Sequence, residues 1–136
     1  MLDGCLLKEL NLSNFNTVNV NDLSYMFNES KSLRKINLSI FNIDNVTDMS
    51  YMFSGCKLLK KINLPNFNTK NVKDMSFMFN HCESLEELDL SNFKTHNVKN
   101  MNSMFFNCRK LKELNLINFK TNCVNNMKNM CFFLLL

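Results

Sequence analysis

Cysteine and histidine are the side chains of this chain best suited to metal binding, redox chemistry or catalysis. The chain contains six cysteines and two histidines, and three of the cysteines, Cys56, Cys82 and Cys108, recur at a fixed interval of 26 residues. Zinc needs four converging ligands, and a disulfide needs two Cα atoms about 4.4 to 6.8 Å apart. His81 adjoins Cys82, but His96 holds a different position within the interval, and no CxxC or HxxxH spacing occurs. We therefore expect a buried column of free thiols and no metal.

Catalytic motifs are missing from the sequence. There is no glycine-rich phosphate loop, no nucleophile elbow, and no histidine placed with a serine or cysteine in a known motif. Glu87 and Glu113 share one position of the interval, but like charges on neighbouring strands are common on solvated surfaces. We expect no enzymatic activity, no catalytic residue and no cofactor.

Composition favours a folded chain that is not inserted in a membrane. The hydrophobic content is 46% and the net charge is +4, which argues against disorder. No apolar run approaches the roughly 20 residues of a membrane span, and the first residues lack the features of a signal peptide. The sequence leaves the redox compartment open.

A 26-residue repeat positions all these side chains. Leucine begins an L-x-x-L or L-x-x-I tetrad at residues 7, 33, 59, 85 and 111. After an N-terminal stub of residues 1–6, this predicts five repeats that fill residues 7–136, namely 7–32, 33–58, 59–84, 85–110 and 111–136. We call residues that share one position in successive repeats a column.

Two periodicities lie inside each repeat. The first half alternates apolar and polar residues, as in a strand with one buried face. In the second half, apolar residues follow the spacing of a helix face, and in three repeats an Asn with an Asp three residues later resembles a helix cap, as in Asn71 and Asp74. The sequence therefore predicts an α/β solenoid of the leucine-rich-repeat type, with a parallel sheet on one side and helices of two to three turns on the other.

The repeats resemble a known family. The stretches LNLSNFNTVNVNDLSYMF (residues 10–27) and INLPNFNTKNVKDMSFMFNHC (residues 62–82) are similar to the 26-residue repeat of bacterial surface proteins, grouped with BspA-like leucine-rich repeats. The resemblance covers residues 7–136. It implies display at a cell surface or outside the cell, with roles in adhesion and protein binding. The last repeat departs from the pattern, since Cys123 and Cys131 replace its Asn and Phe.

The predicted strand face is the candidate binding surface, because outward side chains of successive strands form a ladder. The ladder has two columns, a charged rung of Glu and Lys residues and an Asn rung of Asn and Asp residues. We expect a protein partner, or a glycan, and not nucleic acid, because the charged rung carries both signs. Stacking of the amides along the solenoid is an alternative, purely structural explanation of the Asn rung. The candidate residues are Glu9, Asn11, Lys35, Asn37, Lys61, Asn63, Glu87, Asp89, Glu113 and Asn115.

Basic residues concentrate towards the C-terminal repeats. Lys94 and Lys120 share one column, and Lys73 and Lys99 share another, which predicts a basic edge. Such an edge suits nucleic acid, an anionic glycan or an acidic protein. Solvated lysines from a genome rich in A and T are the plainer explanation.

Three functional hypotheses follow. The first is a surface-displayed adhesion or protein-binding module, as the resemblance implies. The second is an intracellular interaction scaffold, since the chain shows no signal peptide and a cytoplasmic location stays open. The third is a fragment of a larger repeat protein without a role of its own, because the apolar C-terminus lacks the polar cap that solenoids usually need. Uncapped ends also allow end-to-end self-association.

Overall fold

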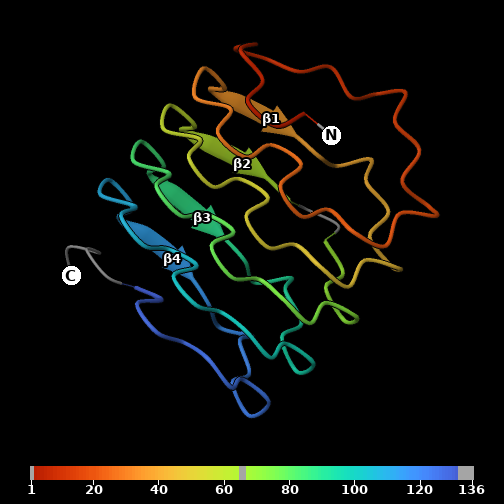
Figure 1. Cartoon of the computed structure of the whole chain (residues 1–136), viewed down its shortest axis with the longest axis vertical. Helices are drawn as coiled ribbons and strands as arrows, with labels where there is room; N and C mark the ends of the chain where they lie inside the picture. The colour runs from red at the N-terminus through yellow and green to blue at the C-terminus, as the bar shows by residue number, and fades with distance from the viewer. Residues whose placement is uncertain (1, 65–66, 132–136) are drawn as a thin grey trace.

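The protein winds into a stack of flat coils, one for each repeat, as a computed structural model shows (Figure 1). The structure describes residues 2–64 and 67–131. Its four short strands lie side by side along one side of the stack, and the chain advances from coil to coil between the two ends. The strands are β1 (Lys35–Asn37), β2 (Lys61–Asn63), β3 (Glu87–Asp89) and β4 (Glu113–Asn115).

The strands pair in parallel with a constant offset of one repeat. β1 pairs with β2 so that Lys35 lies opposite Lys61, and β3 pairs with β4 so that Glu87 lies opposite Glu113. An isolated bridge from Glu9 to Lys35 continues the same register into the first repeat. Equivalent residues of successive repeats therefore stand beside one another, which confirms the predicted solenoid with parallel strands.

The core consists of the apolar columns that the repeat predicted. Leu, Ile, Val, Met, Phe and Cys side chains of the three central repeats are buried in one continuous cluster. Burial is lost at the ends of the stack, where Phe15 is 45% exposed and Met127 is 42% exposed, although both belong to apolar columns that are buried in the central repeats. Their columns are correct, but the end coils have a neighbouring coil on one side only.

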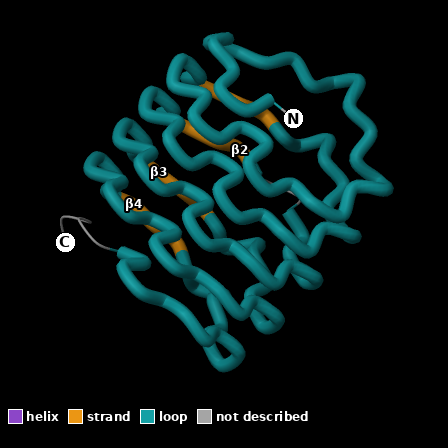
Figure 2. Tube along the Cα trace, viewed as in Figure 1, coloured by secondary structure: helices purple, strands orange, loops and turns teal. Residues whose placement is uncertain are grey.

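The predicted helices were wrong. Among the described residues no helix occurs, and the second half of each repeat is a series of turns (Figure 2). We call residues 23–30 and their equivalents the turn ladder. Along it, the amides of Tyr51 and Phe53 donate to the next repeat, at Ser76 O and Met78 O, while the amide of Ser54 closes a turn onto Tyr51 O. Consequently the described residues contain no helix able to span a membrane.

Stacking distance explains why turns replace helices. A helix with its side chains is about 10 to 12 Å wide, whereas parallel strands lie about 4.8 Å apart. The rings of Tyr25 and Tyr51, in adjacent repeats of the turn ladder, are stacked with centroids 4.6 Å apart, and those of Tyr51 and Phe77 are 4.5 Å apart. The turn side is thus as closely spaced as the strands.

The residues predicted to cap helices have other tasks. Asp74 Oδ1 accepts the amide of Ser76, two residues later, and so fixes the first turn of the ladder. The side-chain amide of Asn71 donates to Asp44 O of the preceding repeat. Phe77 and His81 have positive φ angles, 57° and 56°. They occupy the third position of turns, where a type II β-turn requires a positive φ.

A buried threonine column also joins the coils. Thr95 is fully buried, and its hydroxyl donates to Lys120 O at 2.8 Å and accepts the Lys120 amide at 2.6 Å. Thr69 bonds Lys94 of the next repeat in the same way. One side chain thereby satisfies two backbone groups of the neighbouring coil.

Replacing Thr95 by valine should destabilise the protein. Valine keeps the shape but leaves the Lys120 amide and carbonyl without their partner, at a cost of about 1 to 3 kcal/mol for the buried groups. Urea denaturation measures the difference in the free energy of unfolding. Thr121→Val is the matched control, because Thr121 has the same position in the last repeat and is exposed. Equal losses in both variants would contradict the role of the threonine bridge.

Candidate functional site

The strand face displays all ten candidate residues to solvent. In β1, Lys35 and Asn37 are exposed on either side of buried Ile36, and the other strands repeat this alternation, with Leu114 of β4 half-buried. Glu9 and Asn11 of the first repeat are exposed as well. The structure therefore places the ten residues in two adjacent columns on a single surface.

The Asn rung has a structural task that involves its oxygen atom. Asn37 Oδ1 accepts the amide of Ser39 at 3.0 Å, and Asp89 Oδ1 accepts the amide of Ser91 at 2.8 Å. These are Asx turns, which end each strand and turn the chain. The side-chain oxygen therefore bonds within its own repeat, instead of stacking along the solenoid as the structural alternative supposed. Fixed in this way, the exposed amide groups present donors in a defined direction.

A hollow lies on the strand face above the first three repeats. Its volume is about 780 Å³, and its walls are exposed side chains that include Lys35, Lys61 and Asn63. Ile36, only 5% exposed, and half-buried Leu10 also line it and supply apolar surface. Polar walls around a small apolar floor are the usual composition of a recognition surface.

The charges of the strand face form a basic block and an acidic block, preceded by Glu9 of the first repeat. Lys35 and Lys61 are neighbours in the register, and so are Glu87 and Glu113. Where the basic block meets the acidic one, the backbone pairing is weaker, since the Glu86 amide lies 3.4 Å from Lys60 O while the equivalent bonds elsewhere measure 2.9 to 3.1 Å. The face thus carries both signs, with a pair of lysines between Glu9 and a pair of glutamates.

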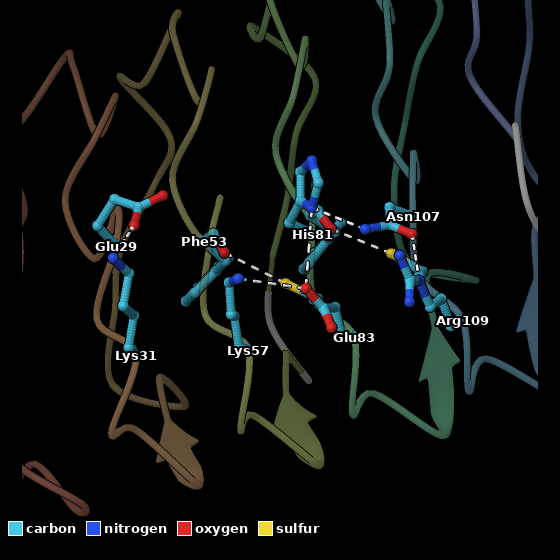
Figure 3. A network of polar contacts seen from close by, with 11 residues as sticks. Glu29, Lys31, Phe53, Lys57, His81, Glu83, Asn107 and Arg109 are labelled. Carbon is cyan, nitrogen blue, oxygen red and sulfur yellow. Dashed lines mark hydrogen bonds and ion pairs between the residues drawn. The ribbon is translucent and has the colours of Figure 1, made fainter.

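The thiol column lies inside the turn ladder. All six cysteines are free, and Cys56, Cys82 and Cys108 are buried. Each buried thiol donates to a carbonyl of the preceding repeat, as Cys82 Sγ does to Phe53 O at 3.2 Å (Figure 3). Burial raises the pKa of the Cys56 and Cys108 thiols to about 12 and that of Cys82 well above its ordinary value. These groups are therefore neutral packing residues.

The raised pKa of the thiols predicts that stability falls in alkali. Unfolded cysteines ionise near pH 9, whereas the folded ones keep their protons, so their contribution is complete below pH 9 and declines from pH 9 towards 12. The free energy of unfolding should fall by at most about 1.4 kcal/mol per pH unit for each thiol. Urea denaturation at pH 8 and pH 10, under reducing conditions, measures it.

The triple variant Cys56→Ser, Cys82→Ser, Cys108→Ser is the control for this pH effect. Serine is the natural residue of the column at Ser30, whose hydroxyl donates to Leu2 O at 3.2 Å. In this variant, the free energy of unfolding should lose most of the decrease between pH 8 and pH 10 that the thiols cause. An unchanged difference between pH 8 and pH 10 would show that other groups cause it.

His81 belongs to a polar network at the rim of the turn ladder (Figure 3). Its Nδ1 lies 2.7 Å from the side-chain amide of Asn107, whose Oδ1 accepts Arg109 Nε at 2.6 Å. Glu83 lies 3.9 Å from the same ring nitrogen and pairs with Lys57 at 3.4 Å. In the described parts of the chain no group of three metal-binding side chains occurs. The network links neighbouring repeats through hydrogen bonds.

The predicted basic edge lies at the turn that follows the Phe column. Lys94, Lys99 and Lys120 are exposed there. Lys94, His96 and Lys120 line a second hollow of about 410 Å³ between the fourth and fifth coils. The structure thus brings together lysines that are up to 26 residues apart in the sequence.

Comparison with known proteins places the chain in a family. The family described as "Mycoplasma protein of unknown function, DUF285" matches residues 1–86 and again residues 35–133. The chain belongs to this family. No curated protein sequence matches it. A crystal structure of a leucine-rich repeat protein from T. pallidum is similar to 87% of this chain and 72% of that one, at 17% identity and a TM-score of 0.43.

Sequence reasoning missed two features of this member of the family. The apolar floor of the strand-face hollow, Leu10 and Ile36, was assigned to the core alone. The stack of Tyr25, Tyr51 and Phe77 was also overlooked, although three aromatic residues at intervals of 26 were a visible signal. Its exposed member is Tyr25, at 40% exposure.

Proposed function

We propose that this chain is a non-enzymatic binding module that recognises a protein, or alternatively a glycan, through its strand face. The observation that carries the proposal is the pair of exposed columns beside a hollow with an apolar floor. Strands that pair in register hold these side chains at fixed spacing, so that little freedom is lost when a partner binds.

The chemistry of the face supports a protein partner. Asn37 presents a fixed amide, Lys35 and Lys61 present positive charge, and Ile36 and Leu10 present apolar surface within one hollow. Glu87 and Glu113 add a negative block beside it. A partner with both charge signs and an apolar protrusion fits this arrangement, and a uniform polyanion does not.

Display at a cell surface is part of the same proposal. Its support is the resemblance of the repeats to those of bacterial surface proteins. Fractionation of cells that make the native protein tests this location, and we expect the protein with the surface or extracellular fraction. Recovery in the cytosol would favour an intracellular scaffold.

Charge reversal on the strand face should abolish partner binding without unfolding the protein. The variant is Asn37→Asp, Lys61→Glu, Asn63→Asp, which copies residues that repeat four carries naturally at Glu87 and Asp89. Aspartate keeps the oxygen that ends the strand. Arrays of purified proteins and glycans, probed with the labelled chain, identify bound spots, and the variant should weaken them about tenfold or more.

A matched variant controls for net charge. Asn21→Asp, Lys110→Glu, Asn122→Asp makes the same change in charge at exposed positions away from the strand face. It should bind as the native chain does. If the strand-face variant binds equally well, or both variants fail alike, the strand face is not the recognition surface.

A further inference from the structure

The basic edge carries charges that no neighbouring acid neutralises. Among the described residues, no ion pair involves the four lysines of its two columns. A turn, closed by the Val98 amide on Thr95 O at 3.0 Å, separates the two columns, so they flank one corner of the coil. The four exposed lysines are Lys73, Lys94, Lys99 and Lys120.

Asp74, which follows Lys73 in the sequence, bonds to neutral groups. Asp74 Oδ1 accepts the amide of Ser76 at 2.7 Å and its hydroxyl at 2.6 Å, and Asp74 Oδ2 accepts the side-chain amide of Asn100 at 3.0 Å. Asp44 pairs with Lys70 at 3.6 Å, at the border with the second repeat. Because none of the four lysines takes part in an ion pair among the described residues, their ammonium groups are available to a ligand, and Asp74 lowers the net charge of the edge by one.

Polar groups surround the lysines in the hollow between the last two coils. Its lining includes Lys94, His96 and Lys120, together with Ser91, Thr95 and Asn118. The side-chain amide of Asn118 donates to Ser91 O and so joins the two walls. The hollow thus combines cations with serine and amide groups that hydrogen-bond to hydroxyl-bearing ligands.

We propose that the basic edge binds a linear polysaccharide that carries sulfate or carboxylate groups. Neighbouring coils lie at strand spacing, about 4.8 Å apart, so Lys94 and Lys120 form one row of cations along the stack and Lys73 and Lys99 form another. A linear polyanion that lies along the stack contacts both rows. On the same side, Asp22, Asp44 and Asp48 lie in the first two repeats, whereas Asp74 is the one acidic residue among the corresponding residues of the last three. The ligand therefore lies along the last three repeats.

Nucleic acid fits the edge less well. Proteins that bind single strands without sequence preference stack bases on exposed aromatic rings. The aromatic residues at this edge, Phe93 and Phe119, instead stack on each other with centroids 6.5 Å apart, and Phe93 is buried. The edge therefore offers charge and hydrogen bonds, but no aromatic platform for bases.

Binding of heparin to the native chain and its variants tests the proposal. Lys94→Gln, Lys99→Gln, Lys120→Gln should raise the Kd for heparin about tenfold or more at physiological salt. The control Arg34→Gln, Lys35→Gln, Lys61→Gln removes the same charge from the strand face and from exposed Arg34 beside it, and should change the Kd less than about threefold. Neutral dextran should not bind. Circular dichroism and urea midpoints confirm that the variants fold.

A gain of binding provides an independent test. Thr47 is exposed and precedes Lys73 and Lys99 in their column, so Thr47→Lys lengthens that row by one repeat and should tighten heparin binding about two- to fivefold. The proposal is overturned if the lysine variant of the edge binds heparin as the native chain does, or if the strand-face control loses as much. Tighter binding of oligothymidylate than of heparin would instead assign the edge to nucleic acid.

Discussion

Backbone hydrogen bonding between repeats is the constraint on which the rest of the structure depends. On the strand side, parallel pairing sets residues exactly one repeat apart beside each other, and on the turn side alternate amides, such as those of Tyr51 and Phe53, do the same. A coil without a neighbour leaves these donors without protein partners, and it exposes core residues, as Phe15 shows. Stability therefore comes from stacking, as expected for solenoids.

This constraint turns sequence columns into physical rows. Buried rows of Phe side chains stack at 5.4 to 5.9 Å, from Phe27 to Phe105, and the thiols from Cys56 to Cys108 bond carbonyls of the preceding coil. Exposed rows have the same regularity. Because each row consists of residues from one position of successive repeats, the same substitution in two or three repeats is enough to create a continuous charged or polar surface.

The two exposed surfaces differ in charge. On the strand face, Lys35 and Lys61 lie between Glu9 at the N-terminal end and Glu87 and Glu113 towards the C-terminal end. At the turn edge, acidic residues predominate in the first two repeats, and lysines outnumber the single Asp74 in the last three. A single chain thereby presents two surfaces of different charge, one mixed and one mainly basic in its last three repeats.

By itself, the sequence determined the repeat length, the buried columns, the strands and the two surfaces, because a strict period of 26 residues dictates which side chains align. Tertiary structure decided what the second half of each repeat becomes. Its apolar spacing fits a helix or a series of turns, but only turns are thin enough to stack at 4.5 Å, the distance between the rings of Tyr51 and Phe77. Tertiary structure also decided the side-chain partners of Asn37 and Asn71, because the partner of Asn37 depends on where its own coil bends and that of Asn71 on what the neighbouring coil presents.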